Sequence, residues 1–405
     1  MNKKILIAGG LVLILALLGV WGYILIYGTP ERVEEVFSNF NFSSEQPAPA
    51  PQPSTTENDA DFTTEPPGVG TAVTPPGDLP ALRQLTTEPV AGFQLVAENA
   101  TNTAAYALYA KAGTGHIYRH DLTSNQRERL SNFTIPQAHD AYFTRDGQYG
   151  VVISGFTTEQ RLHIFDLEQA NGTNTDPKII PIDARNFGIG EDNTLFYTVV
   201  ENNQTRAFAY DFTTNTDREL FRTPLTQITV AWGPSADNTH YFYPRAATGL
   251  ESPVFIAQQG TIRRGTINVS ELSLFTDGTR IGYSFATAAN ERLSFAHHTN
   301  ASELLPFSTP VLADKCYFVR ENSLLCAASF EAISMSDWYK GSNISGDDLF
   351  WNINYQRGTS RSLANLSGNT GRDIAVERLL GNQVTALFRN RLDGNLWVYA
   401  HNLIE

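Results

Sequence analysis

The chain has 405 residues, of which 41% are hydrophobic, 11% aromatic and 18% charged, and this composition excludes a chain that is disordered throughout. Its formal net charge of −13 argues against nucleic acid as a partner, because an acidic surface repels phosphate backbones. Thr, Asn, Gly and aromatic residues are prominent, which favours strands and turns over helices.

The first predicted element is a transmembrane helix over residues 5–27, which contain no charged side chain. Such a helix spans roughly 34 Å, enough to cross a hydrocarbon core of about 30 Å. Lys3 and Lys4 precede it, so the positive-inside rule places residues 1–4 in the cytoplasm and the rest of the chain outside. The sequence thus predicts a single-pass anchor in the cell membrane. A cleaved signal peptide is the alternative, and it would also export the domain.

Two further segments separate this helix from the folded domain. Residues 28–42 are expected to contain a short amphipathic juxtamembrane helix. Residues 43–81 are rich in Pro, Ser and Thr and have few large apolar side chains, so they are predicted to be a disordered linker. The remainder, residues 82–405, is predicted to fold.

Two kinds of hairpin recur in this folded part. In one, the turn lies at Asn125, Asn215 or Gly358, which are residue types that tolerate positive φ. The other has Asp-Gly between apolar runs, as in residues 141–153 and 272–283. With both as markers, units begin near residues 92, 138, 184, 228, 270, 311 and 372. Their size, about 40–45 residues, is that of a four-stranded propeller blade. The sequence predicts an all-β protein, a β-propeller with seven blades, and six or eight remain open.

The last unit contains only three predicted strands before the chain ends. Residues 82–86 resemble the outer strands of other units, such as residues 127–131 and 218–221. We therefore expect residues 82–86 to complete the last blade, which would join the two ends of the domain and remove an exposed edge.

The strand–Asp-Gly–strand units resemble the WD40-like repeats of TolB-type propellers, over residues 92–403. The order of anchor, Pro-rich linker and propeller also resembles that of bacterial membrane-anchored propeller proteins. Residues 315–327 and 337–341 carry that second resemblance. The first resemblance implies the propeller fold, and the second implies no activity.

Two features stand out in the sixth unit. Cys316 and Cys326 flank a hairpin whose turn would place them opposite each other, so a disulfide is expected in an exported domain, with two buried thiols as the alternative. Residues 329–349 interrupt the repeat and are interpreted as an inserted loop. Its predicted binding residues are Asp337, Trp338, Tyr339 and Lys340. Exposed aromatic residues of this kind anchor interfaces, although they could instead cap the edge of the blade. Asp348, near the end of the insertion, is expected in a solvated loop.

A second candidate surface is the mouth of the central channel, where the innermost strands begin. Its polar residues are His139, Asp140, Arg185, Asn186, Glu271, Asp314, Arg372 and Asp373. A merely solvated rim is the alternative reading of these residues.

No sequence motif indicates a catalytic group, a metal site or a cofactor. The chain is therefore predicted not to be an enzyme but to be a binding or scaffold module for a protein or glycan partner in the cell envelope. One alternative is a glycan- or peptide-processing enzyme with its site at the propeller centre. The other is a subunit of a secretion or pilus-like assembly.

Overall fold

The computed structural model describes residues 81–97, 105–155, 160–167, 178–181, 183–247, 249–287, 292–299, 306–307, 309, 311–312, 315–328, 348–366, 371–378 and 383–402. The chain divides into two compact units, residues 1–68 and 69–405, and every described residue belongs to the second. The predicted anchor, the juxtamembrane helix and residues 43–80 of the linker lie outside the described residues. Among those that are described, no helix is long and apolar enough to span a membrane.

The described residues form antiparallel strands grouped into six sheets. The first three sheets are β2 (Val90–Ala97), β3 (Ala105–Lys111), β4 (Ile117–Asp121) and β5 (Arg127–Arg129); β6 (Ala138–Phe143), β7 (Tyr149–Ser154), β8 (Arg161–Asp166) and β9 (Lys178–Pro181); and β10 (Ala184–Ile189), β11 (Leu195–Glu201), β12 (Gln204–Asp211) and β13 (Thr216–Thr223). Each of these sheets is built from strands that follow one another in the sequence.

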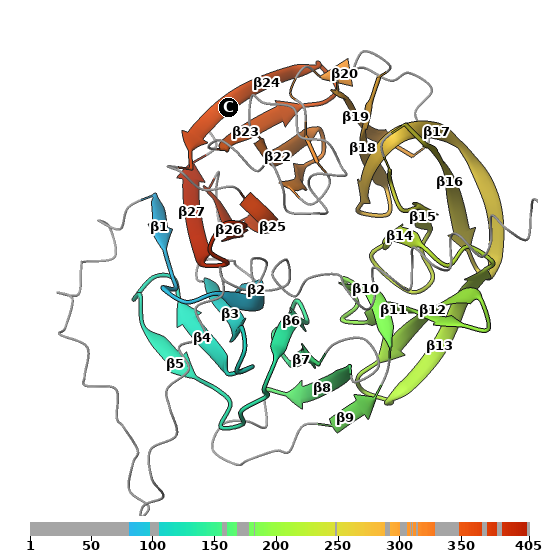
Figure 1. The fold of residues 1–405 in the computed structure, drawn as a ribbon. Coiled ribbons are helices and arrows are strands. Elements are labelled where there is room, and N and C mark those ends of the chain that lie inside the picture. The colour runs from blue at the N-terminus through green and yellow to red at the C-terminus, as the bar shows by residue number, and fades with distance from the viewer. Residues whose placement is uncertain are drawn as a thin grey trace, which may run out of the picture. The chain divides into compact units, whose positions relative to one another are not determined.

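The fourth sheet has seven strands, and the last two have four each. The seven are β14 (Ile228–Ala231), β15 (His240–Pro244), β16 (Glu251–Gln258), β17 (Thr261–Thr276), β18 (Arg280–Ala286), β19 (Arg292–His298) and β20 (Pro306–Phe307). The remaining sheets are β21 (Cys316–Arg320), β22 (Ser323–Ala328), β23 (Leu349–Asn354) and β24 (Thr359–Asn365); and β25 (Gly371–Arg378), β26 (Gln383–Asn390), β27 (Leu396–Asn402) and β1 (Leu82–Gln84). Figure 1 shows the sheets following one another around a ring, with β2, β6, β10, β14 and β25 towards its centre.

The expected role of residues 82–86 is confirmed by the pairing of β1. Leu82 lies opposite Tyr399 of β27, and Gln84 lies opposite Trp397. The backbone N–H of Leu85 also donates to the carbonyl oxygen of Leu396, at 2.8 Å. The beginning of the folded part therefore supplies the outer strand of the sheet that contains its end.

The buried side chains form seven separate clusters. Six of them join one sheet to the next around the ring. The seventh lies inside the seven-stranded sheet and packs Tyr243 and Val254, on β15 and β16, against Leu272 and Leu274 near the end of β17. That sheet therefore folds onto itself and encloses apolar side chains between its two halves. These halves are here called limbs: one contains β14–β16 and the other β18–β20, and β17 joins them.

Strand β17 connects the two limbs, because it pairs with a strand of each. Residues from Thr261 to Ser270 pair with β16, and residues from Ser270 to Thr276 pair with β18. A β-bulge between Ser270 and Ser273 marks the change of partner, and bulges bend and twist a strand. The unit predicted to begin near residue 270 thus begins within strand β17.

Candidate functional site

The polar residues predicted at the channel mouth differ widely in exposure. The side chains that the structure describes are exposed His139 and Arg185, half-buried Asp140 and Asn186, and buried Glu271. Asp314 lies outside the described residues, and for Arg372 and Asp373 only the backbone, in β25, is described. The structure does not bring these residues together as one set of exposed groups.

β-Bulges explain why polar residues interrupt these strands. Register shifts fall around His139 in β6, around Asn186 in β10, around Glu271 in β17 and around Asp373 in β25. Asn186 and Glu271 both have φ of 50°, in the left-handed region that few residues other than glycine adopt. A bulged residue leaves the ladder, so its side chain need not be apolar.

Glu271 is buried and forms an ion pair with Arg292. Nη2 of Arg292 lies 3.1 Å from Oε2 of Glu271, and the two side chains are only 4% and 7% exposed. Nη1 of Arg292 donates to the carbonyl oxygen of Glu271 at 3.2 Å. Burial lowers the pKa of Arg292, and the charge of Glu271 opposes that shift. This pair holds the bulge at which β17 changes partner.

A second buried ion pair lies at the starts of β21 and β23. Nζ of Lys315 lies 2.9 and 2.7 Å from the two carboxylate oxygens of Asp348, and both side chains are at most 2% exposed. Asp348 was expected in a solvated loop, and the structure corrects this. Cys316 and Cys326 occupy opposite positions on β21 and β22 and form a disulfide, with Cα atoms 4.1 Å apart. The insertion residues Asp337, Trp338, Tyr339 and Lys340 lie outside the described residues.

A cavity among the described residues lies between the two limbs of the seven-stranded sheet and is here called the inter-limb cavity. Its volume is about 700 Å³, within the range of roughly 300–1,000 Å³ found for sites that bind small molecules. Its lining residues are Thr239, Tyr241, Val254, Ile256, Arg263, Arg264, Gly265, Thr266, Ile267, Asn268, Val269, Gly278, Ile281, Tyr283, Phe285, Phe295, His297 and Thr299.

Strand β17 contributes consecutive residues to this lining because of a second, wider bulge. Pro253 pairs with Asn268 and Phe255 pairs with Arg264, so Val254 alone faces the three residues between them. Consecutive side chains of a regular strand point to opposite faces, and a bulge disturbs that alternation. The bulge therefore brings apolar and polar side chains of one strand to the same cavity.

The cavity is lined by basic residues and by no acidic residue. The basic residues are Arg263, Arg264 and His297. Neither arginine forms an ion pair with a described carboxylate, and both are exposed. Glu251 accepts a hydrogen bond from the side-chain amide of the lining residue Asn268, and it is not itself part of the lining.

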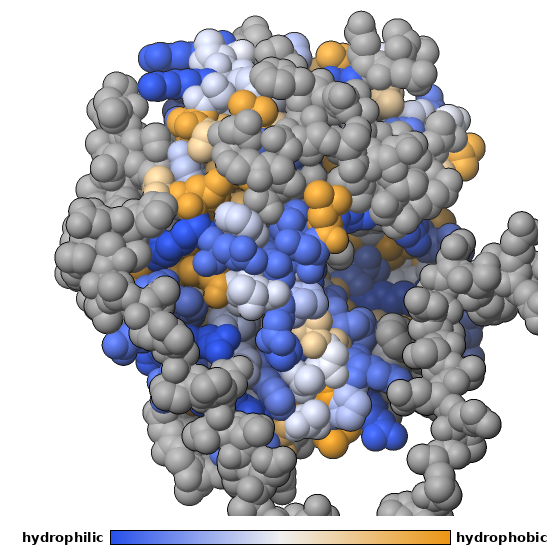
Figure 2. All heavy atoms as spheres, turned by 60° about the vertical axis from the view of Figure 1, so that its left-hand side comes forward, coloured by the Kyte–Doolittle hydropathy of each residue, from blue (hydrophilic) through white to orange (hydrophobic). Residues whose placement is uncertain are grey.

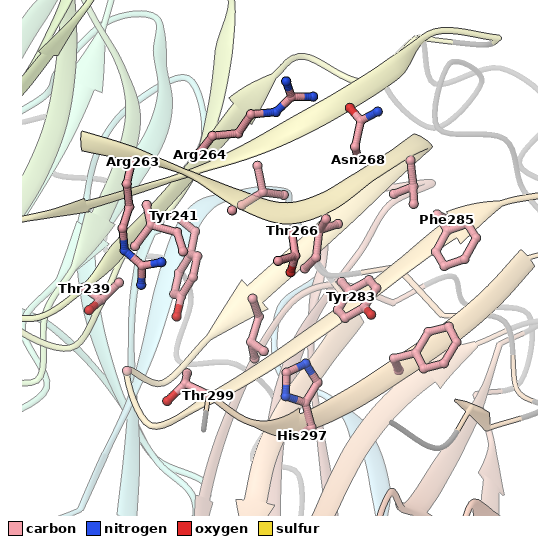
Figure 3. A pocket seen from close by; sticks show the side chains of 18 residues that line it. Thr239, Tyr241, Arg263, Arg264, Thr266, Asn268, Tyr283, Phe285, His297 and Thr299 are labelled. Atoms are coloured by element: carbon pink, nitrogen blue, oxygen red, sulfur yellow. The ribbon is translucent and has the colours of Figure 1, made fainter. Parts of the chain in front are cut away.

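Arg263 lies beside a buried phenol. Figure 3 shows its guanidinium reaching towards Thr239 and Tyr241, whereas Arg264 extends in the opposite direction. Burial raises the pKa of Tyr241, and the positive charge of Arg263 partly offsets this shift. Tyr241 therefore stays protonated at neutral pH and can donate a hydrogen bond next to a cationic group.

The opposite wall of the cavity is aromatic. The rings of Tyr283 and Phe295 have centroids 5.4 Å apart and planes inclined by 17°, and those of Phe285 and Phe295 are 6.0 Å apart and inclined by 2°. The rings of Tyr283 and His297 meet at 88°, with centroids 6.2 Å apart, and Figure 3 shows Phe285 farther from His297 than Tyr283 is. Burial raises the pKa of Tyr283, which keeps this hydroxyl neutral too. The three near-parallel rings, Tyr283, Phe285 and Phe295, are here called the aromatic platform.

Sequence reasoning missed this cavity. A usable signal was present: Arg263 and Arg264 are adjacent in a chain whose net charge is −13, and the next carboxylate after them is Glu271. The enclosure itself depends on how β17 changes partner, which no local motif encodes. Among the described residues, no group of His, Cys, Asp and Glu side chains could hold a metal ion.

Comparison with known proteins identifies the fold but no close relative. No family model matches the chain, and no curated protein is found to be similar. The β-propeller domain of the trilobed protease from Pyrococcus furiosus matches with a TM-score of 0.52 at 12% identity, over 78% of this chain and 98% of that one. Oligogalacturonate lyase from Vibrio parahaemolyticus matches with 0.51 at 12% identity, over 79% and 93%. TolB from Acinetobacter baumannii matches less well, with 0.41 at 11% identity, over 65% and 64%. The expected β-propeller is thus confirmed at the level of the fold by the first two of these structures.

One prediction is overturned by these comparisons. The chain was predicted not to be an enzyme because no sequence motif indicates a catalytic group. Oligogalacturonate lyase is an enzyme, and the match covers 93% of its chain. A chain with this fold can therefore be an enzyme, and the argument against one fails.

Proposed function

We propose that this chain is a membrane-anchored propeller of the cell envelope that binds a small organic anion in the inter-limb cavity. The observation that carries the proposal is the charge of that cavity. Arg263, Arg264 and His297 line it without any acidic residue, although the chain as a whole has a net charge of −13. A basic site within an acidic protein attracts an anion locally, where the rest of the surface repels it.

The form of the cavity also supports small-molecule binding. Sites for small molecules are concave and mostly apolar, with a few polar groups that orient the ligand. Val254, Ile281 and Tyr283 provide buried apolar walls here, and Arg263 supplies a planar donor group suited to a carboxylate. The four large apolar side chains that are exposed among the described residues, by contrast, are distributed over separate elements: Ile179, Leu250, Leu293 and Leu392.

Among the described residues on the face drawn in Figure 2, hydrophilic residues separate small hydrophobic patches. Larger exposed apolar patches mark sites of interaction with proteins. The predicted loop Asp337–Lys340 remains a separate hypothesis for a protein or glycan partner.

The proposal includes the membrane anchor at residues 5–27 and an extracytoplasmic position for the propeller. It also includes seven blades, with β17 shared by two of them. The seven buried clusters support this count, since each would fill one interface between neighbouring blades.

Binding is tested on the full chain in lipid nanodiscs by calorimetric titration with 2-naphthoate and with a β-1,4-linked triglucuronate. We expect at least one of these anions to bind with one-to-one stoichiometry. Arg263→Gln should weaken that binding at least about tenfold, because a charge-assisted hydrogen bond contributes roughly 1.5–3 kcal/mol.

Arg185→Gln is the matched control, because Arg185 is an exposed arginine at the predicted channel mouth, outside the cavity lining. It should leave the affinity unchanged. Failure of both anions to bind would overturn the proposal, as would binding that depends on Arg185 and not on Arg263.

A further inference from the structure

We infer that the ligand of the inter-limb cavity is an acidic oligosaccharide, an inference that rests on the proposed function and specifies its ligand class. Three features of the cavity carry it: the aromatic platform, the cationic group at the other end, and the polar side chains between them. Each restricts the ligand in a different way.

The aromatic platform selects for a ring. Its three side chains stack on one another, with centroids 5.4 to 6.4 Å apart and planes inclined by only 2° to 17°, so they form one continuous aromatic wall. Such a wall gains most from an apolar partner of similar size, such as the C–H face of a pyranose or another aromatic ring. Small inorganic anions, or acetate, would leave it in contact with water.

The cationic end selects for a carboxylate. Arg263 presents a planar guanidinium that can bind both oxygens of a carboxylate, and Tyr241 beside it is a neutral donor. Arg263 is not engaged by a described carboxylate of the chain itself. It can therefore meet an acidic group of the ligand without first breaking an ion pair.

The polar side chains favour a sugar over an aromatic acid. Thr239, Thr266 and Thr299 contribute hydroxyl groups, and Asn268 contributes an amide, on walls formed by different strands. Hydroxyl and amide groups can both donate and accept, which matches the many hydroxyls of a carbohydrate. An aromatic carboxylate would leave these groups without partners when it displaced their water, which costs affinity.

The volume favours more than one sugar residue. About 700 Å³ accommodates a ligand of drug size, well beyond a single small acid. The aromatic platform and Arg263 lie on different strands across this space, so one ring can stack while a neighbouring uronic acid meets the guanidinium.

The test compares four probes on the full chain in nanodiscs: β-1,4-linked triglucuronate, its neutral counterpart cellotriose, 2-naphthoate and acetate. We expect triglucuronate to bind at least tenfold more tightly than each of the other three. Phe285→Leu should weaken triglucuronate binding about fivefold, because the platform loses a ring while the site stays apolar. The melting temperature of this variant establishes that it is folded, and Phe295→Leu provides a second variant if it is not.

Each outcome is decisive. Tighter binding of naphthoate would overturn the carbohydrate class while leaving the proposed function intact. Equal binding of acetate and triglucuronate would overturn the role of the platform, and equal binding of cellotriose would overturn the requirement for an acidic group. If no anion binds, the proposed function fails together with this inference.

Discussion

His240 lies buried between the sheet of β10–β13 and that of β14–β20, where its ring contacts Phe196 and Trp232. Its Nδ1 accepts a hydrogen bond from the backbone N–H of Gly233, at 3.0 Å, so the ring is held in its neutral form. Burial lowers the pKa of His240 to about 4. The unfolded chain should titrate near 6.5 at this residue.

This difference makes folding stability depend on pH. Between pH 6.5 and 4 the unfolded state binds a proton at His240 that the folded state does not, so the free energy of unfolding falls as the pH falls. The contribution of this residue lost by pH 4 is roughly 3 kcal/mol. We expect His240→Asn, whose side-chain oxygen can still accept from Gly233, to show a weaker loss of stability over this range.

Urea unfolding at pH 7, 5.5 and 4.5 measures the effect. His139→Asn is the matched control, because His139 is exposed and should leave the slope as in the unaltered chain. The comparison with the unaltered chain is necessary, since burial also lowers the pKa of His116, His120 and His163. Equal pH dependence of the His240 variant and the unaltered chain would contradict the assignment.

At the scale of strands and turns, the sequence predicted what local chemistry determines. Asn125, Asn215 and Gly358, chosen because they tolerate positive φ, have φ of 57°, 56° and 63°. Units expected near residues 138, 184 and 228 begin at Ala138, Ala184 and Ile228. A turn that requires positive φ favours Asn or Gly at that position, so these boundaries could be predicted from the sequence.

The candidate site could not be predicted in the same way. The inter-limb cavity exists because β17 continues through the expected boundary near residue 270 and changes partner at a bulge. Such a bulge depends on pairing with strands on both sides and on the buried contact between Glu271 and Arg292. In the sequence, Glu271 is only one more polar residue at the start of a strand, and it was interpreted as part of the channel mouth.

The pairing of β1 with β27 gives a prediction at the same scale. A chain that begins at residue 90 lacks β1 and leaves β27 as an exposed edge. It also lacks Leu85, so the apolar residues that Leu85 covers become more exposed. We expect this chain to melt at least several degrees lower than a chain that begins at residue 79, or to aggregate. Thermal unfolding followed by circular dichroism, with light scattering for aggregation, compares the two. Identical midpoints and cooperativity would show that β1 does not stabilise the ring.

At the scale of the whole molecule, the charge on either side of residues 5–27 determines the expected orientation. Lys3 and Lys4 lie before this segment, and Glu31, Glu34 and Glu35 lie after it. The linker at residues 43–81 contains no bulky apolar run that could fold and shield its backbone. It is therefore the part of the exported chain that a protease should cut first.

Protease added to intact cells should accordingly release a soluble fragment that begins near residue 80 and retains the propeller. Mass spectrometry of the released fragment locates the cut, and its disulfide between Cys316 and Cys326 should hold the β21–β22 hairpin closed during digestion. Inside-out vesicles are the control, because the same protease should reach only residues 1–4 there and leave the propeller intact. Release from inside-out vesicles, with protection in intact cells, would reverse the orientation. It would also place the inter-limb cavity in the cytoplasm, where an extracellular acidic oligosaccharide could not reach it.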